Sequence, residues 1–271
     1  MSADPDGAAS PSSSGTPFED RLTVLLRDVA AGAVPPDAAL SALRDLPFAD
    51  LGYARVDHHR ELRQGQCEIV FAPGKGVHEV AGIVRQLLAG NEGPVLVSRA
   101  DPDQRGAVRT VAAELGLPVE ERPRPGAIAV MRNVPHATGV VLVVTAGTSD
   151  LAVAEEAQLT ASLMGVEAQL VADVGVAGLH RVAAVRDRIE DADAVVVMAG
   201  MEGALASVIG GLARGPVVAC PTSVGYGASF GGLAALLSML SSCAPGVVCV
   251  DIDDGVGAGF AAALMARGRR A

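Results

Sequence analysis

The sequence predicts an α/β fold, in which a small N-terminal α/β domain precedes a doubly wound parallel sheet with helices on both faces. In residues 136–271, apolar runs rich in valine alternate with helical patterns, as right-handed βαβ crossovers require. Glycine and polar residues recur directly after these runs, where open α/β sheets bind their ligands. Aromatic residues form only 3% of the chain, so valine, alanine, leucine and glycine must build the core.

Composition limits the classes of function. The net charge of −10 argues against a nucleic-acid partner held by phosphate neutralisation, and no apolar run approaches the ~20 residues of a membrane span. Residues 1–16 lack the basic region and apolar core of a signal peptide, and their Ser/Pro-rich composition predicts a disordered tail. The four cysteines form no C-x-x-C pair, so we expect reduced thiols in a cytoplasmic protein.

The N-terminal domain is expected over residues 17–135. Apolar spacing predicts helices over 18–31, near 36–43 and over 77–88, with short strands over 67–71, 95–98 and 127–130. A dense polar cluster contains Asp57, His58, His59, Arg60 and Arg63. Adjacent histidines point in different directions on a strand, so a solvated turn or a phosphate contact is favoured there over a metal site.

The second domain is expected over residues 136–271. Strands are predicted over 140–145, 168–172, 194–198, 217–219 and 247–252, and helices over 151–164, over a stretch that ends near 189, and over 259–267. The first strand stops at the turn AGTSD. Gly147, Thr148 and Ser149 would bring backbone N–H groups and hydroxyls to a helix N-terminus, which is an anion site. A simple helix N-cap at Ser149 or Asp150 explains these residues equally well.

Three further loops, over 173–181, 199–204 and 221–232, combine glycine with reactive polar groups. Glu202, beside Gly203, is either a helix cap or a buried acid with a raised pKa that suits proton transfer. His180 is either structural or merely exposed, or it is a functional residue, which the neighbouring glycines favour; the family motifs named below imply proton transfer for it. Tyr226 would stack on a ring, close a pocket or simply pack.

Cys243 follows a helical pattern and precedes Ala-Pro-Gly. A buried, inert thiol is the usual fate of a cysteine. A helix C-terminus also disfavours a thiolate, so activation of a nucleophile here would have to come from His180, a cationic ligand or another loop.

The chain resembles the LarB family, the pyridinium-3,5-biscarboxylic acid mononucleotide synthases of nickel-pincer nucleotide biosynthesis. Five motifs carry the resemblance in order: TAGTSDLAVAEEA, DVGVAGLHR, AGMEGALASVIGGL, PTSVGYGASFGGLAALLSMLSSCAPG and DIDDGVGAG. The segment DHHRELRQGQCEIVFAPGK extends the resemblance into the first half, so that it covers about residues 50–265. The second half also looks like the PurE-type aminoimidazole ribonucleotide carboxylases and mutases, which implies a Rossmann-like, three-layer αβα domain.

This resemblance implies that nicotinic acid adenine dinucleotide is carboxylated by CO₂ or bicarbonate and that its phosphoanhydride is hydrolysed. Cys243 would be the nucleophile by similarity to the SCAPG segment, with Glu202, His180 and Asp150 in the same site. Substrate binding would fall to the following residues: Gly147, Thr148, Ser149, Gly203, Thr222, Ser223, Tyr226, Arg60 and Lys75. Mg²⁺ would neutralise the phosphoanhydride charge, although no metal-ligand spacing is visible. The resemblance also implies a homo-oligomer such as an octamer, whose Ala/Gly-rich helix over 231–240 packs against a partner.

The sequence departs from the family pattern at two places: DIDDG stands where an Asn is expected, and Cys220 stands where an apolar residue is expected. Cys220 is a rival thiol, although a packed cysteine at a strand end is favoured. Two other functions stay open. A PurE-type enzyme acts on a substrate that is already a nucleophilic enamine and needs no thiol, and a nucleotide-binding sensor would bind without turnover.

Overall fold

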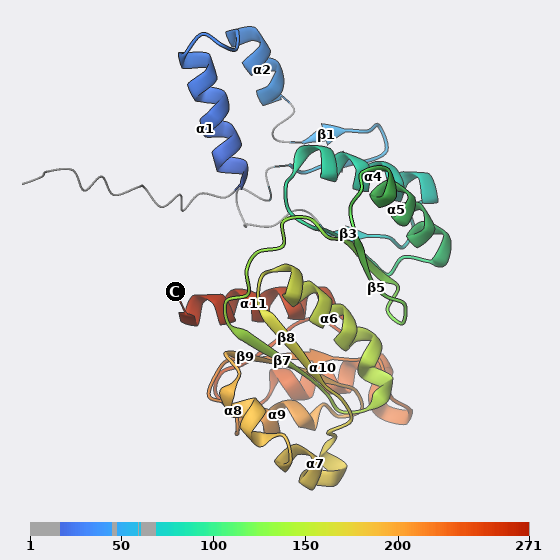
Figure 1. The fold of residues 1–271 in the computed structure, drawn as a ribbon. Coiled ribbons are helices and arrows are strands. Elements are labelled where there is room, and N and C mark those ends of the chain that lie inside the picture. The colour runs from blue at the N-terminus through green and yellow to red at the C-terminus, as the bar shows by residue number, and fades with distance from the viewer. Residues whose placement is uncertain (1–16, 45–47, 59, 61–68, 271) are drawn as a thin grey trace, which may run out of the picture.

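The computed structural model describes residues 17–44, 48–58, 60 and 69–270, and it shows two α/β units, one above the other (Figure 1). The predicted tail over 1–16, together with His59, Arg63 and Cys67, lies outside the described residues. The N-terminal elements are α1 (Pro17–Ala30), α2 (Pro36–Arg44), β1 (Ala49–Asp50), β2 (Arg55–Val56), β3 (Val70–Phe71), α4 (Val77–Gly90), β4 (Val95–Ser98), α5 (Pro102–Glu114), β5 (Val119–Arg122) and β6 (Ala127–Val130).

The C-terminal unit alternates strands and helices. Its elements are β7 (Val140–Thr145), η1 (Thr148–Asp150), α6 (Leu151–Leu163), β8 (Glu167–Val171), η2 (Val176–Gly178), α7 (Leu179–Ala183), α8 (Arg186–Asp191), β9 (Ala194–Ala199), α9 (Ala204–Gly210), β10 (Val217–Pro221), η3 (Gly227–Gly232), α10 (Leu233–Leu240), β11 (Val247–Cys249) and α11 (Gly255–Arg270). The strands form one parallel sheet in the order β11-β10-β9-β7-β8. Because β8 lies on one side of β7 and the later strands lie on the other, the winding direction reverses between β7 and β9. Such a point marks the ligand crevice of an open α/β sheet.

Helices cover both faces of this sheet (Figure 1). One face packs against α6 and α11 through alanines such as Ala157 and Ala262, and the other packs against α8 and α9 through Ile189 and Leu205. Helices α6 and α11 approach so closely that a Cβ at Gly259 would overlap the backbone oxygen of Ala157. All six residues of β9 are buried, as expected for a central strand covered on both faces.

The smaller sheet has the order β3-β4-β6-β5 and is mixed, because β6 runs antiparallel to β4 and β5. One face packs against α4 and α5, while Leu96 and Ala129 on the other face pack against Leu159 and Leu163 of α6. Helix α6 is therefore buried between the two sheets, which explains why its apolar residues are not confined to one side.

The structure confirms the predicted fold class. The second half agrees closely with the sequence prediction, although the stretch expected as one helix up to residue 189 is split into α7 and α8, and the final helix is longer than 259–267. The N-terminal prediction missed α5 and β5. Helix α5 has few apolar residues because only one of its sides faces the core, through Val108 and Val111.

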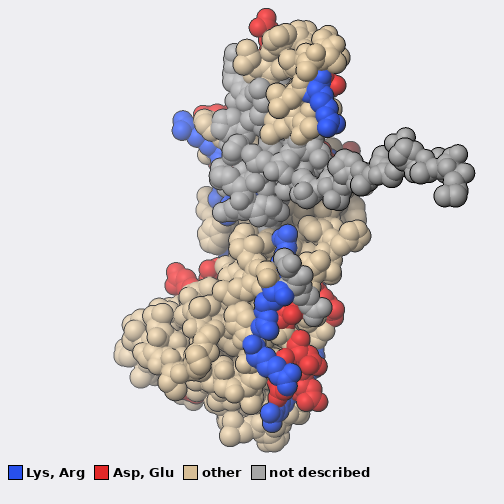
Figure 2. All heavy atoms as spheres, turned by 90° about the vertical axis from the view of Figure 1, so that its left-hand side faces the viewer, with Lys and Arg blue, Asp and Glu red and all other residues tan. Residues whose placement is uncertain are grey.

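On the face of the molecule in Figure 2, acidic and basic side chains are intermixed in a strip over the lower unit, and further charged side chains lie near the top. Ion pairs of this kind join Glu190 to both Arg186 and Arg214 at 2.5 and 2.7 Å. Within the described part of the chain, no helix combines the length and apolar character that a membrane crossing requires.

Candidate active site

A cavity of about 340 Å³ lies at the carboxyl edge of the large sheet, where the winding direction reverses. The loops after β7 and β9 form its walls, together with the segment after β8. Four residues predicted from the sequence line it: Gly147, Ser149, Asp150 and Glu202. Thr148 is exposed in the same η1 turn and is not among the lining residues.

Asp150 is the buried acid of this cavity, with only 2% of its surface exposed. Its Oδ1 accepts a hydrogen bond from Thr222 Oγ1 at 2.6 Å, and its Oδ2 accepts one from the Gly147 backbone N–H at 2.8 Å. Burial raises the pKa of the Asp150 carboxyl; the two hydrogen bonds oppose this rise and the charge of Asp253 adds to it. Asp150 precedes α6 but does not cap it with its side chain. It braces the loops after β7 and β10 and holds a proton more readily than an exposed aspartate does.

Glu202 is not the buried acid that one interpretation of the sequence favoured. It is exposed in the turn after β9, and the N-cap of α9 is Gly203 rather than Glu202. Gly203 itself is buried at φ +67, where an added Cβ would lie 3.0 Å from the Ala235 backbone oxygen. Glu202 lines the cavity from its rim, whereas Asp150 lies within the wall.

The sequence analysis overlooked Arg181, which supplies a guanidinium to this cavity. Arg181 Nη1 forms an ion pair with Asp173 Oδ1 at 2.8 Å and donates to the Asp173 backbone oxygen at 2.9 Å. His180, the predicted proton-transfer residue beside it, is exposed and does not line the cavity. The short helix α7 therefore turns the arginine, and not the histidine, toward the site.

The loop after β10 is only partly in contact with the cavity. Thr222 is fully buried and acts through Asp150, while Ser223 is exposed and donates its backbone N–H to Asp253 Oδ1 at 2.9 Å. Tyr226 is 80% exposed and does not line this cavity. The loop thus braces the site through Thr222, and its tyrosine does not close the pocket within this chain.

Gly200 permits the close approach of the loops after β9 and β10. A Cβ at this position would overlap the Val224 backbone oxygen and would lie 2.9 Å from Thr222 Oγ1. Gly200→Ala is therefore expected to destabilise the protein by about 2 kcal/mol through overpacking, as measured by urea denaturation. Gly211→Ala is the control, because its Cβ would meet nothing closer than 3.5 Å, and an equal loss in both variants would contradict the role of close approach.

Cys243 lies at the other edge of the large sheet. It follows the C-terminus of α10 and precedes β11, and its neighbour Ser242 bonds to Ser207 on α9 at 2.9 Å. Helix α9 runs from Gly203 at the carboxyl edge toward this region, so its seven residues separate Cys243 from the cavity by roughly 10 Å. The thiol is exposed and does not line the cavity. The rival Cys220 is fully buried, and burial raises the pKa of its thiol, as expected for a packed cysteine.

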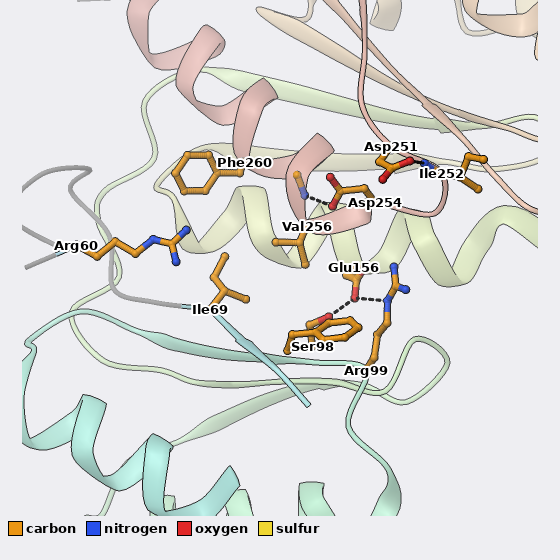
Figure 3. A pocket seen from close by; sticks show the side chains of 12 residues that line it. Arg60, Ile69, Ser98, Arg99, Glu156, Asp251, Ile252, Asp254, Val256 and Phe260 are labelled. Carbon is orange, nitrogen blue, oxygen red and sulfur yellow. Dashed lines mark hydrogen bonds and ion pairs between the residues drawn. The ribbon is translucent and has the colours of Figure 1, made fainter. Parts of the chain in front are cut away.

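Two further cavities, of about 680 and 480 Å³, lie between the two units. The larger is lined by Arg99, Arg105 and Arg124 on the N-terminal side and by Ser149 and Ser223 on the C-terminal side. The smaller is drawn in Figure 3, where Ile69 and Arg60 approach the same space as Val256 and Phe260.

Glu156, which no sequence pattern singled out, lies where these two cavities meet (Figure 3). It is 2% exposed on α6, accepts a hydrogen bond from Ser98 Oγ at 2.6 Å, and pairs with Arg99 Nε at 3.6 Å. Burial raises the pKa of its carboxyl, against the opposing effects of Ser98 and Arg99. Arg99 also donates to the Asp253 backbone oxygen, so one arginine joins the N-terminal unit to two elements of the C-terminal unit.

The predicted N-terminal site residues fall in different places. Arg60 lines the 480 Å³ cavity, but Lys75 Nζ donates to the Phe71 backbone oxygen at 2.6 Å and lines none of the three cavities. His58 is buried, with its Nε2 3.3 Å from Gln86 Nε2. Among the described residues, no three His, Cys, Asp or Glu side chains gather closely enough to hold a metal ion.

The fold and the site define a doubly wound α/β protein with a cavity at the carboxyl edge of its sheet, and two family models place it among carboxylase-type enzymes. The model of the LarB/PurE-like N-terminal domain matches residues 48–124, and that of AIR carboxylase matches residues 140–270. The chain belongs to the LarB family, whose C-terminal domain is PurE-like.

The chain is also similar to an uncharacterized protein of Methanocaldococcus jannaschii, with 37% identity over 79% of this chain and 84% of the relative. Two crystal structures of Treponema denticola proteins match about half of the chain. They are a single-site variant of PurE2, with 18% identity over 48% of this chain and 91% of that chain, and PurE, with 24% identity over 47% and 77%; the TM-score is 0.36 for both.

Proposed function

We propose that this enzyme carboxylates the pyridinium ring of nicotinic acid adenine dinucleotide and hydrolyses its phosphoanhydride, giving pyridinium-3,5-biscarboxylic acid mononucleotide and AMP for nickel-pincer nucleotide biosynthesis. The observation that carries the proposal is a run of three adjoining cavities. The 340 Å³ cavity shares Ser149 and Val224 with the 680 Å³ cavity, which shares Arg99 and Glu156 with the 480 Å³ cavity. An extended space of this kind suits a dinucleotide better than it suits a mononucleotide.

The proposed chemistry needs a nucleophile, because a pyridinium ring is electrophilic and does not attack CO₂. Addition of a thiolate to the ring forms a C–S bond, breaks the aromaticity and leaves an enamine, whose carbon forms the new bond to CO₂. Loss of the proton from that carbon and expulsion of the thiolate, which takes back the electron pair of the C–S bond, restore the ring. We assign the thiolate to Cys243 by similarity to the family's SCAPG segment.

The carboxyl-edge cavity supports the remaining steps. Asp150 can accept the proton from the ring carbon, because its raised pKa brings it nearer to neutrality than an exposed aspartate. Arg181 can pair with a carboxylate on the ring, and Glu202 is available as a second proton carrier at the rim. In the hydrolytic step, Mg²⁺ would be bound by the phosphate oxygens of the substrate and would neutralise their charge.

Because Cys243 and Asp150 lie at opposite edges of the sheet, we propose that the thiol reaches the cavity from a second copy of the chain. Helix α10, which ends just before Cys243, exposes Leu233, Leu237 and Leu240 by 44, 56 and 64%. These positions lie on one side of the helix, as in an apolar face that packs against a partner. The homo-oligomer expected from the sequence would thus complete the site.

Mixing two inactive variants tests this arrangement. Asp150→Asn and Cys243→Ala should each have at most about 1% of the wild-type activity, whereas random 1:1 subunit exchange should leave about one quarter of the sites with both native groups and raise the activity accordingly. If native mass spectrometry shows mixed oligomers and activity stays absent, the thiol and the acid belong to the same chain.

The reaction itself is tested with nicotinic acid adenine dinucleotide, bicarbonate and Mg²⁺, with the products followed by mass spectrometry. We expect a mononucleotide with one added carboxylate, together with AMP. Turnover of an aminoimidazole ribonucleotide instead would assign a PurE-type activity. This activity is the second candidate, because it needs no thiol and Cys243 lies outside the cavity. Tight binding of the dinucleotide without turnover would indicate a sensor.

A further inference from the structure

We infer that the two interdomain cavities bind the nucleotide that leaves the substrate, a purine nucleoside monophosphate, with its phosphate in the 680 Å³ cavity and its base in the 480 Å³ cavity. This inference rests on the proposed function for the dinucleotide, but the site itself is built from residues that no step of the carboxylation uses. It assigns a binding role to the N-terminal unit.

The positions of the cavities support placing the two nucleosides of the dinucleotide in different cavities. The 340 Å³ cavity lies by β7 and β9, and the 480 Å³ cavity lies beyond the end of β11, at Asp251, Ile252 and Asp254. Three strand spacings separate β11 from β7, which is about 14 Å. That distance is suited to a pyrophosphate bridge between two nucleosides, and the 680 Å³ cavity occupies the space between them.

The 680 Å³ cavity has the groups that recognise a phosphate. Arg99, Arg105 and Arg124 line it, and each is oriented by an ion pair with a carboxylate: Glu156 at 3.6 Å, Glu121 at 3.7 Å and Glu155 at 2.6 Å, respectively. A guanidinium has five N–H donors, so these pairs leave others for a phosphate.

Three carboxylates also line this cavity, and each has polar partners of its own: Glu156 is held by Ser98 and Arg99. Asp101 accepts from the backbone N–H groups of Asp103 and Gln104 at 2.9 and 2.8 Å, and Asp253 accepts from Ser223 N–H. These backbone donors partly offset the negative charge of Asp101 and Asp253.

The 480 Å³ cavity has the groups that recognise a purine base. Ile69, Val256 and Phe260 supply apolar walls from the two units, as Figure 3 shows, and Asp251 and Asp254 supply carboxylates that can accept from an exocyclic amine. Glu156 is a positioning residue, because its contacts with Ser98 and Arg99 hold the guanidinium of Arg99 where the two cavities meet.

The test is calorimetric titration of AMP into the full chain, with Arg124→Gln and Arg85→Gln as a matched pair. Both arginine side chains are 54% exposed and pair with a glutamate at 2.6 or 2.7 Å, but Arg85 pairs with Glu114 away from the cavities. We expect Arg124→Gln to weaken AMP binding about tenfold and Arg85→Gln to leave it unchanged. Phe260→Ala should weaken AMP while sparing inorganic phosphate.

Equal AMP affinity in Arg124→Gln and the wild type would overturn the inference, as would a wild type that does not bind AMP. In the dinucleotide assay, Arg124→Gln should raise KM about tenfold and leave the affinity for nicotinic acid mononucleotide unchanged. If the wild type does not turn over the dinucleotide but its AMP binding depends on Arg124, the proposed reaction fails and the nucleotide site stands.

Discussion

Replacing Cys243 by alanine is expected to lower carboxylation of the pyridinium ring by roughly 10³-fold or more, because it removes the thiol proposed to make the ring carbon reactive. The fold should survive, since the side chain is exposed in a loop and contributes nothing to the buried core. Turnover is measured by the appearance of the carboxylated mononucleotide in mass spectra. Far-UV circular dichroism and the urea midpoint establish that the variant is folded.

Cys249→Ala is the matched control for this prediction. Cys249 lies six residues farther along the chain at the end of β11, it is half-buried, and burial raises the pKa of its thiol. We expect this variant to retain activity, because the Cys249 thiol is less readily ionised than an ordinary exposed thiol and has no role in the proposed chemistry. Full activity of Cys243→Ala would remove covalent catalysis and favour a PurE-type reaction, whose enamine substrate needs no thiol.

The fold of the second half could be predicted from the sequence because its signals are local. A central parallel strand such as β9 is buried on both faces and is apolar throughout, and the glycine-containing turns mark where each strand ends. The N-terminal sheet is harder to predict, because strand β5 is VEER and is only half-buried. Its place in the sheet is set by antiparallel pairing with β6, which is a tertiary contact and not a sequence pattern.

From the sequence, only the loops that meet at the site could be predicted, because the topology of the sheet places them together. Parallel strands bring their carboxyl ends together, so the meeting of Gly147, Ser149, Asp150 and Glu202 follows from strand assignment. The strand assignment does not show which acid is buried. Asp150 accepts a hydrogen bond from Thr222, 72 residues away, whereas Glu202 lies at an exposed turn. Sequence reasoning lacks the signal for such long-range pairs.

Arg181 and Glu156 were missed for two different reasons. Arg181 stands directly after His180, and only the turn of α7 decides which of the two faces the cavity. Glu156 lies in an alanine-rich helix, where an acid is ordinarily solvent-exposed, and it is buried because a second domain covers it.

Asp150→Asn should lower kcat about 100-fold, because it removes the carboxylate proposed to accept the ring proton. The asparagine can keep the local geometry: its amide oxygen can accept from Gly147 N–H, and its NH₂ group can donate to Thr222 Oγ1. Asp193→Asn is the control, since Asp193 accepts from the Val140 N–H at the far edge of the sheet. If Asp150→Asn has the same kcat as the wild type, Asp150 has only a structural role.

The same substitution has a second, independent signature in the pH dependence of stability. Burial raises the folded-state pKa of Asp150 above the unfolded value of about 3.9. The protonated acid is therefore favoured by folding, and its contribution to stability is fully present below the unfolded pKa and is lost as pH rises through the folded pKa. The free energy of unfolding of the wild type, measured in urea, should fall relative to that of Asp150→Asn as the pH rises above about 4. A wild type that gains stability relative to the variant over this range would show that the hydrogen bonds from Thr222 and Gly147 outweigh the effect of burial.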